Sequence, residues 1–187
     1  MNWIFLALLA PFIYAVNIFL DKYLIEAKFP DYRALPIFSA IVALPVFVIL
    51  WFFGFGSISF IEALLVILSG VFTVWAFSLY LEALIKEETS IIIILIQLVS
   101  VFVLAMSYLF LGETITLKQM FGFILLLLSA ILASFKKEKK GFRLSTTIFY
   151  MLAANILWAI PYILIKYIST SITFSSLIAY ESFGVSL

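Results

Sequence analysis

The sequence has 187 residues, of which 66% are apolar and 11% are charged, and its mean hydropathy is +1.29. A soluble domain of this size leaves too much surface in water to hide such a composition, so we expect an integral membrane protein. The net charge of +1 argues against a nucleic-acid partner. The absence of cysteine and histidine excludes disulfides and thiolate metal sites, and it removes the commonest general base.

Charged residues divide the apolar sequence into seven runs. A helix needs roughly 20 apolar residues to cross about 30 Å of hydrocarbon, and most of these runs reach that length. The runs are continuously apolar and do not alternate in polarity, which favours spanning helices over barrel strands. The seventh run is still apolar where the sequence stops, so we expect a fragment of a longer transporter. The predicted spans are residues 1–20, 34–55, the run between Glu62 and Glu82, the run between Glu88 and Glu113, and residues 119–135, 144–165 and 172–187.

The first and sixth runs contain similar phrases. Residues 14–23 read YAVNIFLDKY and residues 158–167 read WAIPYILIKY, so both begin with an aromatic residue followed by alanine and both end in Lys-Tyr. Five predicted crossings separate the two phrases, so the second copy enters the membrane from the opposite side. This pattern predicts an inverted-topology repeat, which is typical of secondary transporters.

The positive charges predict an orientation. Of the 11 lysines and arginines, all but Lys118 and Lys166 lie on the side of the membrane opposite the N-terminus. The positive-inside rule then makes the basic loop 136–143 cytoplasmic and the N-terminus extracytoplasmic.

The stretch from Tyr108 to Ser134 carries the most specific motif. It resembles the Leu-Gly-Glu…Thr…Gln…Gly signature of the EamA-type domain of the drug/metabolite transporter superfamily. The phrase YAVNIFLDK resembles the helix-one pattern of that domain, and WAIPYILIK resembles the start of the family's second domain. The matching positions are Leu111, Gly112, Glu113, Thr116, Gln119 and Gly122.

The resemblance implies a ten-helix protein built from two five-helix domains. On this interpretation residues 1–135 form the first repeat, 136–143 a basic linker, and 144–187 the start of an incomplete second repeat. The predicted fold class is therefore an all-α bundle of transmembrane helices with an inverted five-helix repeat.

Several polar residues allow two interpretations. Asn17 either forms an interhelical hydrogen bond or contacts substrate in a central cavity. Lys22 and Lys166 either extend to the headgroups or face the translocation path. Gln97 and Ser100 share one helix face and mark either an interhelical bond or a pathway, whereas the segment from Glu113 to Thr116 is expected to be a structural turn.

We therefore predict a permease that moves a small, uncharged or zwitterionic metabolite by alternating access. No nucleotide-binding loop is present, and no cofactor, metal site or catalytic residue is expected. A membrane scaffold or assembly subunit is the alternative, a membrane enzyme is disfavoured, and dimerisation stays open. The predicted substrate-binding residues are Tyr14, Asn17, Trp75, Gln97, Asn155 and Trp158.

Overall fold

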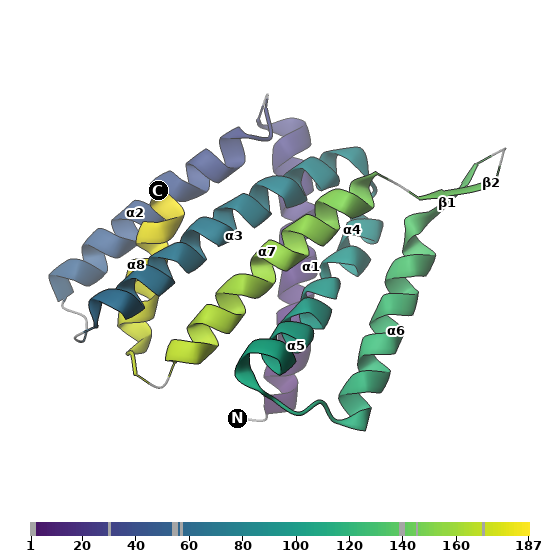
Figure 1. Cartoon of the computed structure of the whole chain (residues 1–187). Coiled ribbons are helices and arrows are strands. Elements are labelled where there is room, and N and C mark those ends of the chain that lie inside the picture. Colours follow the sequence, from purple (N-terminus) through teal and green to yellow (C-terminus); the bar gives the residue numbers. More distant parts are fainter. Residues whose placement is uncertain are drawn as a thin grey trace.

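The computed structural model describes residues 3–29, 31–53, 56, 58–138, 141–144, 146–169 and 171–187. Met1, Asn2, Lys139 and Lys140, the last two from the predicted basic loop, lie outside the described residues. Figure 1 shows the elements, which are α1 (Trp3–Ala27), α2 (Ala34–Phe53), α3 (Phe60–Lys86), α4 (Thr89–Ile96), α5 (Leu98–Leu111), α6 (Leu117–Ser134), β1 (Phe135–Glu138), β2 (Gly141–Leu144), α7 (Thr147–Ile168) and α8 (Phe174–Ser186).

The chain forms a bundle of apolar helices, which confirms the predicted all-α membrane fold. Among the described residues, four helical stretches are long and apolar enough to cross a membrane: Ala34–Phe53, Phe60–Lys86, Thr89–Leu111 and Thr147–Ile168. α1 and α7 carry the two similar phrases and run in roughly opposite directions (Figure 1). This is the relation that an inverted repeat requires.

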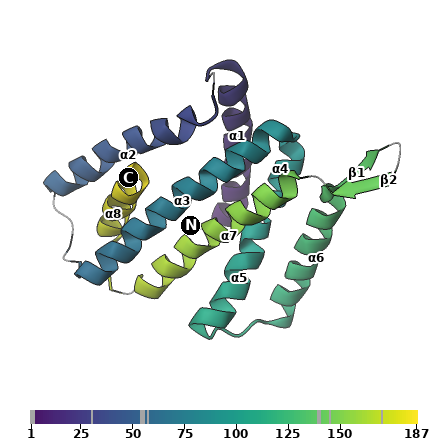
Figure 2. The same ribbon diagram turned by 45° about the horizontal axis from the view of Figure 1, so that its top comes forward.

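α3 lies at the centre of the bundle. It packs against α7 on one side and against α8 on the other, and α2 covers α8 (Figure 2). α7 also packs along α4 and α5. The first helix of the predicted second repeat therefore sits inside the first repeat.

α3 and α8 cross at two glycines. A Cβ atom on Gly70 would contact the Glu181 carbonyl oxygen and would lie 2.7 Å from the Val185 nitrogen. A Cβ atom on Gly184 would contact the Ile67 carbonyl oxygen. Small residues let helix backbones approach closely in membranes, so this crossing depends on the absence of both side chains.

The predicted basic linker contains strands. β1 and β2 pair antiparallel, from Phe135 opposite Leu144 to Glu138 opposite Gly141. The linker is therefore a short hairpin at the end of the bundle where α6 ends and α7 begins (Figure 1). A hairpin outside the hydrocarbon can leave its unpaired backbone groups in water, which a membrane-embedded strand cannot do.

The fourth predicted span is broken where a single helix was expected. α4 ends at Ile96 and α5 begins at Leu98, so Gln97 interrupts the helix. Carbonyl groups just before such a break lose their regular partners four residues ahead. The Asn155 side chain, which is fully buried in α7, donates a 2.9 Å hydrogen bond from Nδ2 to the Leu95 carbonyl oxygen.

Asn155→Leu is expected to lower the free energy of unfolding by about 1–2 kcal/mol, because it removes the buried hydrogen bond to the Leu95 carbonyl at similar side-chain volume. The measurement is SDS-induced unfolding in mixed micelles, followed by circular dichroism. Asn17→Leu is the matched control, since Asn17 is exposed and has no hydrogen-bond partner among the described residues. Equal destabilisation by both substitutions would contradict the role given to Asn155.

The turn between α5 and α6 has the structural character predicted for the motif. Gly112 adopts φ 66°, and its N–H group donates to the Ser107 carbonyl, as does the N–H of Glu113. Thr116 begins α6 with a reciprocal cap: its N–H donates to the Gln119 Oε1 at 2.8 Å, and its Oγ1 accepts from the Gln119 N–H at 3.3 Å. Only glycine adopts this left-handed backbone without strain, which explains Gly112.

Candidate functional site

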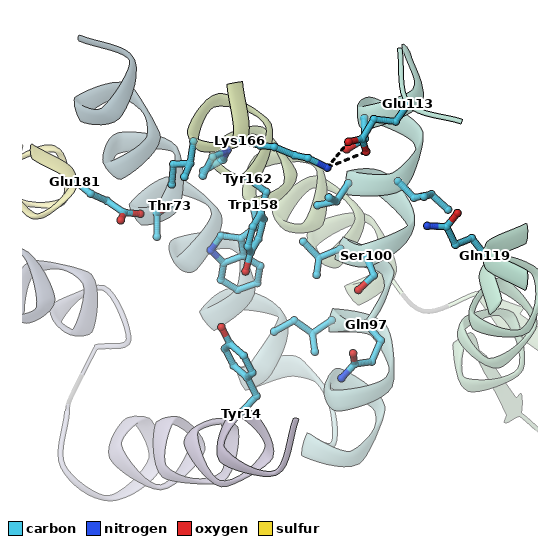
Figure 3. A pocket seen from close by; sticks show the side chains of 17 residues that line it. Tyr14, Thr73, Gln97, Ser100, Glu113, Gln119, Trp158, Tyr162, Lys166 and Glu181 are labelled. Atoms are coloured by element: carbon cyan, nitrogen blue, oxygen red, sulfur yellow. Dashed lines mark hydrogen bonds and ion pairs between the residues drawn. The ribbon is translucent and has the colours of Figure 1, made fainter. Parts of the chain in front are cut away.

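A cavity of about 970 Å³ opens between the helices (Figure 3). The elements α1, α3, α6 and α8 each contribute one lining residue, and the other lining residues come from the α4–α5 segment, the turn after it, and α7. The lining residues are Tyr14, Thr73, Ile96, Gln97, Val99, Ser100, Val103, Leu104, Ser107, Glu113, Gln119, Trp158, Pro161, Tyr162, Ile165, Lys166 and Glu181.

Three of the six predicted substrate-binding residues meet in this cavity. They are Tyr14 from α1, Gln97 from the helix break and Trp158 from α7. Gln97 reaches the cavity because the interruption between α4 and α5 lies at its wall. Figure 3 shows these three side chains on different sides of the same space.

The other three predicted residues lie elsewhere. Asn17 is exposed on α1, away from the cavity lining. Trp75 is 59% exposed and packs edge-to-face on Phe72, at a centroid distance of 6.1 Å. Asn155 is buried and bonded to the Leu95 carbonyl, so its visible role is to join α7 to the helix break.

A buried network supports Trp158. Its ring lies 5.5 Å from the ring of Tyr80 between centroids. Tyr80 is only 2% exposed, and its hydroxyl donates a 2.9 Å hydrogen bond to Asp21 Oδ2. This chain of contacts ties α7 to α3 and α3 to α1, and it holds the indole at the cavity wall.

One ion pair lines the cavity. The Lys166 ammonium lies 2.7 Å from Glu113 Oε1 and 2.8 Å from Oε2, as the dashed lines in Figure 3 indicate. The side chains are 50% and 46% exposed, respectively, so water reaches both. The pair joins the last turn of α7 to the turn after α5, at the end of the bundle opposite the hairpin (Figure 1).

Lys22, which the aligned phrases pair with Lys166, has a different environment. Its ammonium donates to the Leu84 carbonyl at 2.6 Å and to the Glu87 carbonyl at 3.4 Å, and it pairs with Glu26 at 3.3 Å. A cation at the C-terminal carbonyls of α3 is favourable with respect to the helix dipole. Lys22 therefore caps a helix and does not line the cavity.

Two lining residues with polar side chains, Glu181 and Tyr162, were not among the predicted substrate-binding residues. Glu181 lies in α8 and Tyr162 in α7, and the Tyr162 hydroxyl is close enough to Tyr14 and Glu181 to interact electrostatically with both. The signal for Glu181 was its position, because it is the only charged residue in the seventh apolar run. An ionisable residue inside a spanning segment marks a functional position by default.

The sequence model of the EamA-like transporter family matches residues 1–135, which include every helix from α1 to α6. The chain belongs to this family. Comparisons with curated proteins and with solved structures gave no match. The resemblance indicated by the motif between Leu111 and Gly122 is therefore confirmed at the level of the family.

The chain is a member of the EamA-like family, and its described residues include four helical stretches able to span a bilayer, so it is a multi-pass membrane protein. The family is made up of transporters and not of enzymes, and it implies a lipid bilayer and a small-molecule substrate as partners. In this EamA-like chain the cavity offers space and polar side chains, which makes it the candidate site.

Proposed function

We propose that the protein is a secondary transporter that binds a small solute in the cavity and exposes it alternately to the two sides of the membrane. The main support for this proposal is that one cavity of about 970 Å³ is lined by helices of the first repeat and by α7 and α8 of the second. A site between two inverted repeats can open to either side when one repeat tilts against the other.

The lining suits recognition of a small molecule. Ligand sites are mostly apolar, with a few convergent polar groups. Here Gln97, Ser100 and Gln119 supply hydrogen-bonding groups on one wall, and Tyr14 and Trp158 supply aromatic faces. We assign Tyr14, Gln97 and Trp158 as substrate contacts.

We also propose how the chain divides into repeats and how it is oriented in the membrane. Residues 1–135 form the first repeat, 136–143 the linker, and 144–187 the start of the second. The positive-inside rule places the hairpin and its basic residues in the cytoplasm, with the N-terminus on the other side. The Lys166–Glu113 pair then lies at the extracytoplasmic end of the cavity.

Trp158→Ala is expected to reduce transport about tenfold, because it removes an aromatic wall from the binding site. The assay is uptake of labelled small solutes of differing charge by proteoliposomes that contain the protein. Trp75→Ala is the matched control: it deletes the same side chain from an exposed surface outside the cavity. Equal transport by the two variants would remove the cavity assignment, and no uptake of any solute by the unsubstituted protein would favour a scaffold role.

A further inference from the structure

Glu181 is the one carboxylate in the cavity without a partner among the described residues. It is half-buried in α8 and lines the cavity, and Figure 3 shows its carboxylate directed toward Thr73. Neither an ion pair nor a hydrogen bond joins it to any residue that the structure describes. The Glu181 carboxylate interacts electrostatically with the phenol of Tyr162.

The helices around Glu181 offer it no unpaired positive charge. α2 contains no charged residue, and α3 contains none between Glu62 and Glu82. α7 has one cation, Lys166, and Glu113 already neutralises it at 2.7 Å. The charged residues that line the cavity are therefore two carboxylates and one ammonium, which leaves a single excess negative charge.

The backbone at Glu181 is held firmly. A Cβ atom added to Gly70 would be in too-close contact with the Glu181 carbonyl oxygen, so α8 packs directly on the α3 backbone at this residue. Close packing of this kind leaves little freedom to turn the helix and carry the side chain out of the cavity. An unpaired carboxylate that packing holds in a half-buried, mostly apolar cavity is costly, and it is stabilised when a ligand or another residue pairs with it.

Aromatic side chains complete the surroundings. Trp158, Tyr14 and Tyr162 line the same cavity as Glu181 (Figure 3). Aromatic rings attract cations through their negative faces, and tryptophan does so best. A carboxylate together with several aromatic faces is the chemistry that recognises an organic ammonium ion.

We infer that the cavity binds an organic monocation, with Glu181 as its counter-ion and Trp158 and the two tyrosines around its apolar body. This inference rests on the proposed function, because it names the substrate class of the same site. It replaces the sequence-based expectation of an uncharged or zwitterionic solute, which was made without Glu181.

Binding can be tested without transport. The protein has four tryptophans, so a variant in which Trp3, Trp51 and Trp75 are replaced by phenylalanine reports on Trp158 alone. We expect benzyltrimethylammonium, a permanent aromatic cation, to quench this fluorescence saturably in detergent micelles. Benzyl alcohol and benzoate, which are neutral and anionic, should bind more weakly.

Glu181→Gln is expected to weaken benzyltrimethylammonium binding by at least about tenfold and to leave the response to benzyl alcohol unchanged. Glu181→Asp should keep most of the affinity, which shows that the charge matters more than the shape of the side chain. Glu26→Gln is the control, because it removes a carboxylate that pairs with Lys22 outside the cavity. Size-exclusion profiles show whether each variant is folded.

Three outcomes would overturn the inference: no quenching by the cation, tighter binding of benzoate than of the cation, or equal effects of Glu181→Gln and Glu26→Gln. Failure of the proposed function has a different signature. In that case the cation binds and Glu181→Gln weakens its binding, but proteoliposomes take up no solute.

Discussion

Gly70→Ala is expected to lower the free energy of unfolding by about 3 kcal/mol, because the added methyl group meets backbone that cannot rotate away. A Cβ atom at this position would contact the Glu181 carbonyl oxygen, and it would lie 2.7 Å from the Val185 nitrogen and 2.8 Å from the Gly184 carbonyl carbon. Relief requires α8 to move away from α3, which opens the packing on both sides of the crossing. SDS-induced unfolding in mixed micelles, followed by circular dichroism, measures the change.

Gly122→Ala is the matched control for this prediction. Gly122 also lies within a helix, α6, but nothing lies within 4 Å of its added Cβ atom. Alanine has the higher helix propensity, so this variant should be as stable as the original protein or more stable by up to about 1 kcal/mol. If the two glycine variants unfolded at the same SDS fraction, the α3–α8 crossing would not have the tight packing described above.

The helical spans follow closely from the sequence, because lipid imposes a simple rule on a chain of this composition. Apolar runs bounded by charges predicted where helices form, and four of the described helical stretches are long and apolar enough to cross a membrane. Some helices exceed the predicted bounds where charged residues find partners. α1 continues past Asp21 and Lys22 to Ala27, since Tyr80 donates to Asp21 and Lys22 caps α3. Hydropathy marks the hydrocarbon boundary, whereas these long-range bonds decide where the helix ends.

The break at Gln97 and the crossing at Gly70 were not predictable from local patterns. No proline or glycine accompanies the break, and it is joined to Asn155, which lies 60 residues from Leu95 along the chain. Likewise, the crossing needs one glycine from α3 and one from α8, and neither glycine has a small residue four positions away in its own helix. Both features depend on which helices become neighbours, and hydropathy does not carry that information.

The residues of the candidate site were likewise only partly predictable from local sequence patterns. Polar and aromatic residues within apolar runs identified Tyr14, Gln97 and Trp158, which the structure brings together. Asn17 satisfies the same criterion but is exposed, whereas its neighbour Ile18 is buried at 3% exposure. Successive helix residues point about 100° apart, so the identity of a residue does not reveal which face the adjacent helices cover.

The Lys166–Glu113 pair gives the second large effect expected, which concerns access to the cavity. Lys166→Glu places two carboxylates where the ion pair now lies at 2.7 Å, so the end of α7 should separate from the turn after α5. Because the pair is half-exposed, its attraction amounts to about 0.2–1 kcal/mol, equivalent to a 1.4- to 5-fold change in a two-state ratio. Charge reversal adds repulsion to this loss, and we expect a change of about tenfold or more.

The absence of cysteine makes this change measurable. Ser100→Cys places a single thiol at the cavity wall, and a membrane-impermeant maleimide added from the side of the membrane that Glu113 faces reports how often that end is open. We expect faster labelling when Lys166→Glu is added, and the original rate when Glu113→Lys restores the pair in reverse. Lys22→Gln is the control in the other phrase of the repeat, since Lys22 caps α3 outside the cavity and should leave the rate unchanged.

These outcomes separate a gate from a simple structural contact. The pair is too exposed to contribute much to overall stability, so Lys166→Glu should leave the SDS unfolding midpoint nearly unchanged while it alters labelling. A variant that unfolds earlier and labels faster from both sides has merely loosened the bundle. One that labels faster only from the side of Glu113, and recovers with the reversed pair, shows that this contact closes one end of the pathway. An unaltered labelling rate would show that the pair does not control access.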